Sequence, residues 1–69
     1  MDRIDVAAAQ FTTLLAAGYQ PARTHFGLGW VAQARGDRAT AVQEYRRALA
    51  INPDLKAARD ALARIEGKR

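Results

Sequence analysis

The sequence predicts an all-α fold, in which four antiparallel helices follow one another as a helix-turn-helix repeat. Apolar residues recur every three or four positions in four separate segments, which is the pattern of a helix with one buried side. Glycine or proline stands between these segments, where helices end or begin. The middle of the chain also matches its own two ends when it is shifted by 34 positions.

The first helix is expected to begin at Asp2 and to end at Gly18. Asp2 is a good N-cap residue, and Asp5 places a carboxylate in the first turn, where the helix dipole favours it. Glycine accepts the left-handed conformation that closes many helices, so Gly18 marks the end. The side that we expect to be buried is formed by Ile4, Ala7, Ala8, Phe11, Leu14 and Leu15.

The second helix should run from about residue 22 to residue 35, directly after Pro21, which suits a first turn. It carries apolar residues on two opposite sides, so it either packs between two neighbours or offers one side to a ligand. One side holds Leu28, Val31 and Ala32, and the other holds Phe26, Trp30 and Gln33. Gly29 predicts a close approach of the next helix, whereas Gly27 has no explanation at this level.

The third helix is predicted to run from Asp37, its N-cap, to about Ile51. Asn52 precedes Pro53, and a residue before proline avoids the helical conformation, so the helix stops there. Its buried stripe should consist of Ala41, Val42, Tyr45, Ala48 and Leu49. The polar residues that we expect to face away are Gln43, Glu44, Arg46 and Arg47.

The fourth helix is predicted to be capped by Asp54 and to end at Gly67, before the basic pair Lys68 and Arg69. One apolar side and one charged side suit the terminal helix of a repeat array, which must stay in water. The narrow apolar stripe consists of Leu55, Ala58, Leu62 and Ile65. The charged side carries Lys56, Arg59, Asp60 and Arg64.

Residues 22–55 resemble a tetratricopeptide repeat. The residues that carry the resemblance are Leu28, Gly29, Ala41, Tyr45, Ala48 and Pro53, together with the turn at Gly36 and Asp37. Two positions depart from the family pattern, because His25 stands where Trp is favoured and Ala32 stands where Tyr is favoured.

The similarity extends to both flanks of this unit. A shift of 34 positions pairs Ala41 with Ala7, Tyr45 with Phe11, Leu49 with Leu15, and Leu28 with Leu62. We therefore expect one domain in three parts. Residues 1–21 form a half repeat that corresponds to the second helix of a repeat, residues 22–55 form a full repeat, and residues 56–69 form a C-terminal capping helix.

The composition argues against several functional classes. The chain has 69 residues, no cysteine and one histidine, so it can form neither a disulfide nor a thiolate or histidine-rich metal site. It also lacks serine and a glycine-rich phosphate loop after a strand. We therefore expect no enzymatic activity, no cofactor and no small-molecule substrate, and we assign His25 to packing or to the surface.

We expect the chain to be soluble and cytoplasmic. No apolar run approaches the roughly 20 residues of a membrane span. The first ten residues are too acidic and too polar for a secretory signal.

The resemblance implies a protein–protein interaction module or scaffold. Such a module binds a protein or peptide along the concave surface that is formed by the first helix of each repeat. Transferred residue by residue, the groove would be formed by Arg23, Phe26, Trp30, Gln33, Ala57, Asp60 and Arg64. The lysine and asparagine residues with which some members hold a C-terminal carboxylate are replaced here by Phe26 and Trp30. We therefore expect an aromatic groove for an apolar side chain, unless these two rings simply pack on the first helix.

Two other functions stay open. If part of the first helix is uncovered, the chain could form a homodimer, and it could be an excised or engineered repeat fragment whose main property is homodimerisation. The self-associating residues would be Ile4, Phe11, Leu14 and Leu15. The weaker alternative is nucleic-acid binding, which rests on the net charge of +4 and on Arg35, Arg38, Arg46 and Arg47.

Overall fold

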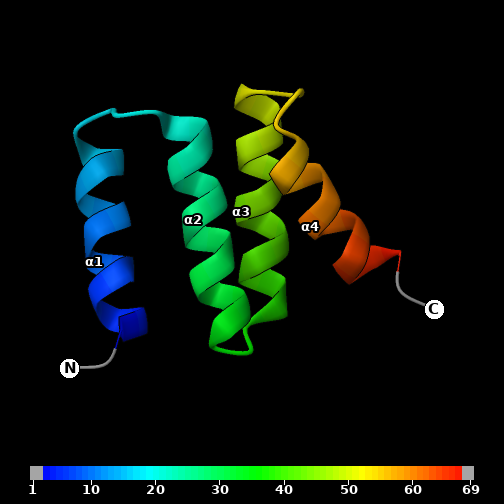
Figure 1. Ribbon diagram of the computed structural model, residues 1–69, viewed down its shortest axis with the longest axis horizontal. Helices are drawn as coiled ribbons and strands as arrows, with labels where there is room; N and C mark the ends of the chain where they lie inside the picture. Colours follow the sequence, from blue (N-terminus) through cyan, green and yellow to red (C-terminus); the bar gives the residue numbers. More distant parts are fainter. Residues whose placement is uncertain (1–2, 68–69) are drawn as a thin grey trace.

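The computed structural model describes residues 3–67, which form four helices in one row (Figure 1). The helices are α1 (Arg3–Ala16), α2 (Pro21–Ala34), α3 (Arg38–Ile51) and α4 (Lys56–Glu66). They run alternately up and down, and each packs on the next one along the chain. The Cα atoms extend over 34 × 25 × 15 Å, so the row is shallowest in its third dimension. The predicted all-α, antiparallel helix-turn-helix architecture is confirmed.

Two glycines close α1 and α2 with the same geometry. Gly18 has a φ of +74° and Gly36 has a φ of +82°, both in the left-handed region that other residues avoid. The amide of the residue after each glycine donates to a carbonyl five positions back, at 3.0 Å and 2.8 Å respectively. This bond is typical of the Schellman motif, and it ends both helices where the glycines predict.

The starts of α2 and α3 also follow the sequence. Pro21 is the first residue of α2. The side chain of Asp37 accepts a hydrogen bond from the backbone N–H of Thr40 at 3.2 Å, which makes Asp37 the N-cap of α3. Hydrogen bonding by the side chain of Thr40, together with this backbone bond, lowers the pKa of the Asp37 carboxyl, because both stabilise the charged form.

The predicted cap of α4 was wrong. The N-cap is Leu55, and it forms no side-chain capping bond. Asp54 instead donates its backbone N–H to the side-chain oxygen of Asn52 at 3.1 Å. This turn spans Pro53, so the N-cap is Leu55 rather than Asp54, and the helix begins at Lys56. Two further predictions, the Asp2 cap and the basic pair at 68–69, lie outside the described residues.

The core lies between α2, α3 and α4 and consists mainly of small side chains. Tyr45, with 1% of its surface exposed, is the largest side chain that is fully buried. None of the described residues of α1 is buried, and α1 packs on α2 at the end of the row. The buried apolar residues are Ala22, Val31, Ala32, Ala41, Tyr45, Ala48, Leu55 and Ala58.

Two glycines of α2 let the neighbouring helices approach closely. A Cβ atom at Gly29 would lie 2.6 Å from Cε1 of Tyr45 on α3. A Cβ atom at Gly27 would lie 2.5 Å from the ring of Phe11 on α1. Both distances are far below the 3.5 to 4.0 Å, roughly, at which carbon atoms pack. The predicted role of Gly29 is therefore confirmed, and Gly27 has the corresponding role toward α1.

Within residues 3–67, none of the helices combines the length and the apolar character that crossing a membrane requires.

Replacing Gly29 by alanine should destabilise the protein, because the new methyl group would overlap the buried ring of Tyr45. Overpacking of this kind costs about 1 to 3 kcal/mol, and the better helix propensity of alanine offsets about 1 kcal/mol of it. We expect the free energy of unfolding to fall by about 1 kcal/mol in urea titrations followed by circular dichroism.

Gly27→Ala is the matched control, since it brings the same gain in helix propensity. Its methyl group would meet the far end of the Phe11 ring, which is only half-buried and has room to swing outward. Gly29→Ala should therefore be the less stable of the two variants. Equal stability would show that the contact with Tyr45 is no tighter a constraint than the contact with Phe11.

Candidate functional site

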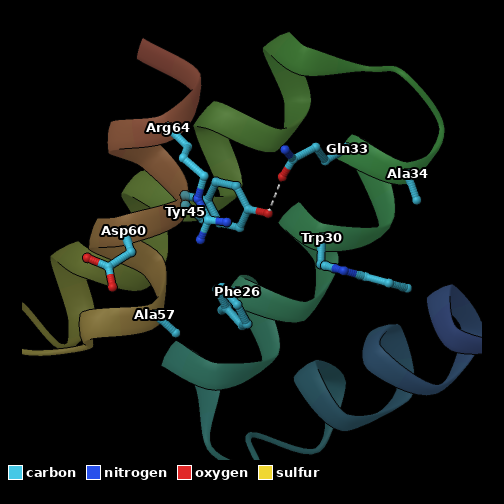
Figure 2. A pocket seen from close by; sticks show the side chains of 9 residues that line it. Phe26, Trp30, Gln33, Ala34, Tyr45, Ala57, Asp60 and Arg64 are labelled. Carbon is cyan, nitrogen blue, oxygen red and sulfur yellow. Dashed lines mark hydrogen bonds between the residues drawn. The ribbon is translucent and has the colours of Figure 1, made fainter. Parts of the chain in front are cut away.

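A pocket of about 400 Å³ lies between α2 and α4 (Figure 2). α2 forms one wall with an aromatic pair, α4 forms the other with a charged pair, and Tyr45 of α3 lies between them. The lining residues are Phe26, Trp30, Gln33, Ala34, Tyr45, Ala57, Asp60, Ala61 and Arg64. Residues three and four positions apart share one face of a helix, which explains how two short segments supply both walls.

The pocket brings together six of the seven residues transferred from the family resemblance: Phe26, Trp30, Gln33, Ala57, Asp60 and Arg64. The seventh, Arg23, lies apart at the start of α2, beside a separate hollow that Ile51 and Asn52 also line. Sequence reasoning missed Ala34, Tyr45 and Ala61. Ala61 follows Ala57 by one helical turn, and this spacing could have identified it. Tyr45 was assigned to the core, where most of it lies.

The two aromatic residues of α2 have different environments. Phe26 is half-buried, and its ring centroid lies 5.6 Å from that of Tyr45, with a tilt of 34° between the planes. It also packs against both clusters of buried residues, so it belongs partly to the core. Trp30 keeps 52% of its surface exposed. A large apolar surface of this kind, next to a pocket, is available to a ligand.

A hydrogen bond joins the core to the pocket. The hydroxyl group of Tyr45 donates to the side-chain oxygen of Gln33 at 2.8 Å, as Figure 2 shows. Burial raises the pKa of the Tyr45 phenol above its usual range, and the positive charge of Arg64 partly offsets this effect. The phenol therefore stays neutral and remains a donor, which fixes the position of Gln33 at the pocket.

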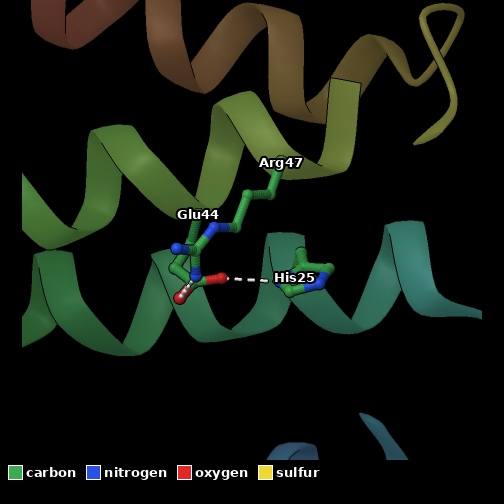
Figure 3. A network of polar contacts seen from close by, with 3 residues as sticks. All are labelled: His25, Glu44 and Arg47. Atoms are coloured by element: carbon green, nitrogen blue, oxygen red, sulfur yellow. Dashed lines mark hydrogen bonds and ion pairs between the residues drawn. The ribbon is translucent and has the colours of Figure 1, made fainter. Parts of the chain in front are cut away.

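A second polar cluster connects α2 and α3 (Figure 3). Nδ1 of His25 lies 2.6 Å from Oε1 of Glu44, and both side chains are only 14% exposed. Arg47 donates to the other carboxylate oxygen of Glu44 at 3.3 Å. The expectation that Glu44 faces away was wrong, because the contact between α2 and α3 is wide enough to include it. His25 takes part in helix packing.

Ion pairs occupy three of the four arginines that the nucleic-acid alternative invoked. Arg35 pairs with Asp5, Arg46 pairs with Glu66, and Arg47 pairs with Glu44. These contacts tie neighbouring helices or turns together, and they reduce the positive potential that a phosphate backbone would meet. Arg38 forms no ion pair within residues 3–67.

The residues predicted for self-association are all partly exposed on α1. Ile4, Phe11, Leu14 and Leu15 are half-buried. The more exposed side of α1 consists of Val6, Ala9, Gln10 and Thr13. A shallow hollow on this side is lined by Ala9, Gln10, Thr13 and Leu14, so Leu14 is the predicted residue that reaches it.

Comparison with known proteins identified one family. The family model described as a tetratricopeptide repeat matches residues 22–55. A search of curated proteins and a search of solved structures each returned no match. Repeats of this family generally mediate protein–protein interactions and are generally not enzymes.

Tyr45→Phe should lower the stability at neutral pH by about 0.5 to 1.5 kcal/mol, because it removes the hydrogen bond to Gln33. It should also flatten the alkaline pH dependence. Tyr45 has a higher pKa in the folded state than in the unfolded state, where it is about 10. Its contribution to the free energy of unfolding is therefore fully present below the unfolded pKa and is lost as pH rises through the folded pKa. Urea titrations from about pH 8 to about pH 11 would measure both effects.

The control for this prediction is Tyr19→Phe, which removes a hydroxyl group from an exposed tyrosine in the turn between α1 and α2. The control should keep the alkaline loss of stability that the original chain shows. If Tyr45→Phe also keeps it, the buried phenol is not its source.

Proposed function

Because residues 22–55 are a tetratricopeptide repeat, we propose that this chain is a protein–protein interaction module whose pocket between α2 and α4 receives an apolar side chain of a partner peptide. The observation that carries the proposal is the exposure of Trp30. A folded chain with such a small core gains stability from every aromatic side chain that it buries, yet this one leaves half of its tryptophan in water.

The chemistry of the pocket supports an apolar ligand group of modest size. Trp30 and Phe26 supply flat apolar surface on one wall, and Ala57 and Ala61 leave space on the other. Gln33, held by Tyr45, can exchange hydrogen bonds with the backbone of a bound peptide. Tryptophan and arginine are the residues most enriched among those that dominate binding energy, and this pocket contains both.

Self-association is a second function that one observation favours. From Val6 to Gln20 the chain has no charged side chain, and the exposed side of α1 lies within this stretch. Two copies of a chain with a net charge of +4 repel each other through charged surfaces, whereas this surface is neutral. A second α1 would supply the neighbour that a half repeat lacks, in a symmetric homodimer.

The pocket can be tested with a peptide that has blocked ends, no tryptophan and a single leucine or phenylalanine. Trp30 is the only tryptophan of the chain, so its fluorescence should shift to the blue when the peptide binds. Trp30→Ala should weaken binding about tenfold or more in calorimetry, because an aromatic wall is lost. Ala57→Gln should weaken it as well, since the longer side chain fills an exposed part of the pocket without touching the core.

Tyr19→Ala is the matched control, because it truncates an exposed aromatic residue that does not line the pocket. It should leave the peptide affinity unchanged. An equal loss of affinity in Tyr19→Ala and Trp30→Ala would place binding elsewhere, and a lack of any fluorescence change with both peptides would refute the pocket as a binding site.

Self-association is tested by sedimentation over a wide range of concentrations. Ala9→Lys, on the exposed side of α1, should dissociate a dimer, because two copies would bring two ammonium groups together. Ala50→Lys adds the same charge at an exposed alanine of α3 and should leave the dimer intact. A single species of 7.6 kDa at every concentration would rule out this function.

A further inference from the structure

The aromatic pocket continues into a second hollow near the turn between α2 and α3. This hollow has a volume of about 350 Å³ and is lined by Gln33, Gly36, Arg38, Arg64 and Ile65. Gln33 and Arg64 also line the aromatic pocket, so the two spaces adjoin at these residues. Together they form one groove, with Phe26 and Trp30 at one end, Arg38 at the other end, and Arg64 at the junction.

The two arginines of this groove carry unbalanced charge. Within residues 3–67, neither Arg38 nor Arg64 forms an ion pair. Four other basic side chains do find carboxylates, whereas Arg23 and Arg59 also lack an ion pair among the described residues but lie outside this groove. The pairs are Arg35 with Asp5, Arg46 with Glu66, Arg47 with Glu44, and Lys56 with Asp60. Two guanidinium groups that line one hollow repel each other, so an anion that binds between them relieves the repulsion and gains charge-assisted hydrogen bonds.

We propose that the partner peptide, which on the proposed function places an apolar side chain against Trp30 and Phe26, also carries an acidic side chain that Arg38 and Arg64 bind. The groove is complementary to such a peptide in both shape and charge. Asp60 limits where the carboxylate can lie, because it lines the aromatic pocket but not the second hollow. An acidic residue at the aromatic end would meet this negative charge.

The dimensions of α2 give the spacing of the two side chains. A helix rises about 1.5 Å per residue, so Gln33, at the junction, is about 5 to 10 Å along the axis from Trp30 and Phe26. An extended peptide advances about 3.3 Å per residue. The acidic residue should therefore lie about two to three positions from the apolar one.

The experiment uses pairs of peptides with one leucine and with either glutamate or glutamine two, three or four positions away, on either side. Acetyl and amide groups block the ends, so that no terminal carboxylate takes part. At the correct spacing, the glutamate peptide should bind about fivefold to tenfold more tightly than its glutamine partner, as measured by Trp30 fluorescence. High salt should remove most of this difference, because it screens the charges.

Arg38→Gln and Arg64→Gln should each reduce the preference for glutamate by about threefold. Arg38 does not line the aromatic pocket, so Arg38→Gln should also leave the affinity for the glutamine peptide unaffected. Arg59→Gln is the matched control, because it removes an exposed arginine from α4 that lines neither part of the groove. The same reduction in Arg59→Gln would overturn the proposal, because net charge alone would then explain the preference.

The outcomes separate the two proposals. If leucine peptides bind but glutamate adds nothing at any spacing, the acidic site is wrong and the apolar pocket stands. If no peptide changes the fluorescence of Trp30, the proposed function fails, and the acidic site fails with it. If a phosphoserine peptide binds and no glutamate peptide does, the two arginines bind a phosphate group. That result would overturn our assignment of a carboxylate to this site.

Discussion

The close approach of Tyr45 to Gly29 is the contact on which the rest of the structure depends. Because residue 29 lacks a Cβ atom, the ring can lie directly against α2. From that position the ring packs near Phe26, and its hydroxyl group reaches Gln33 at the pocket. One buried side chain therefore joins α2 to α3, fills a core otherwise built mainly from small residues, and orders one wall of the candidate binding site.

A related contact joins α1 to α2, where the ring of Phe11 lies against Gly27. Phe11 precedes Tyr45 by 34 positions, so the same position of the repeat supplies α2 with an aromatic ring from each of its two neighbours. The two ends of the row nevertheless differ. The outer side of α4 is charged, whereas most of α1 carries no charge at all. This asymmetry makes α1 the end at which a further neighbour is chemically acceptable.

Periodic features of the structure could be predicted from the sequence, and contacts across helices were harder to predict. Gly18 and Gly36 end helices through their own backbone freedom, so local residues suffice to find them. The need for glycine at position 27 becomes apparent only when the ring of Phe11, from another helix, is seen to lie against it. Glu44 looked exposed on a single helix, yet His25 lies 2.6 Å from its carboxylate. The family resemblance likewise predicted most of the residues that line the aromatic pocket. The position of Tyr45 on its helix did not indicate that its side chain reaches this pocket.

If the proposed function is correct, the position of the groove couples binding to folding. Its walls belong to α2 and α4, and each of these helices packs on α3. A peptide that touches both walls adds contacts that hold α4 against the rest of the row. A chain of this length buries only about 60% of its unfolded surface, so its stability is marginal and such contacts matter. The unfolded chain has no groove, so a peptide binds only the folded state. The free energy of unfolding therefore rises with the logarithm of the ratio of the free peptide concentration to the dissociation constant. Partner binding and folding of the chain are thus expected to be linked equilibria.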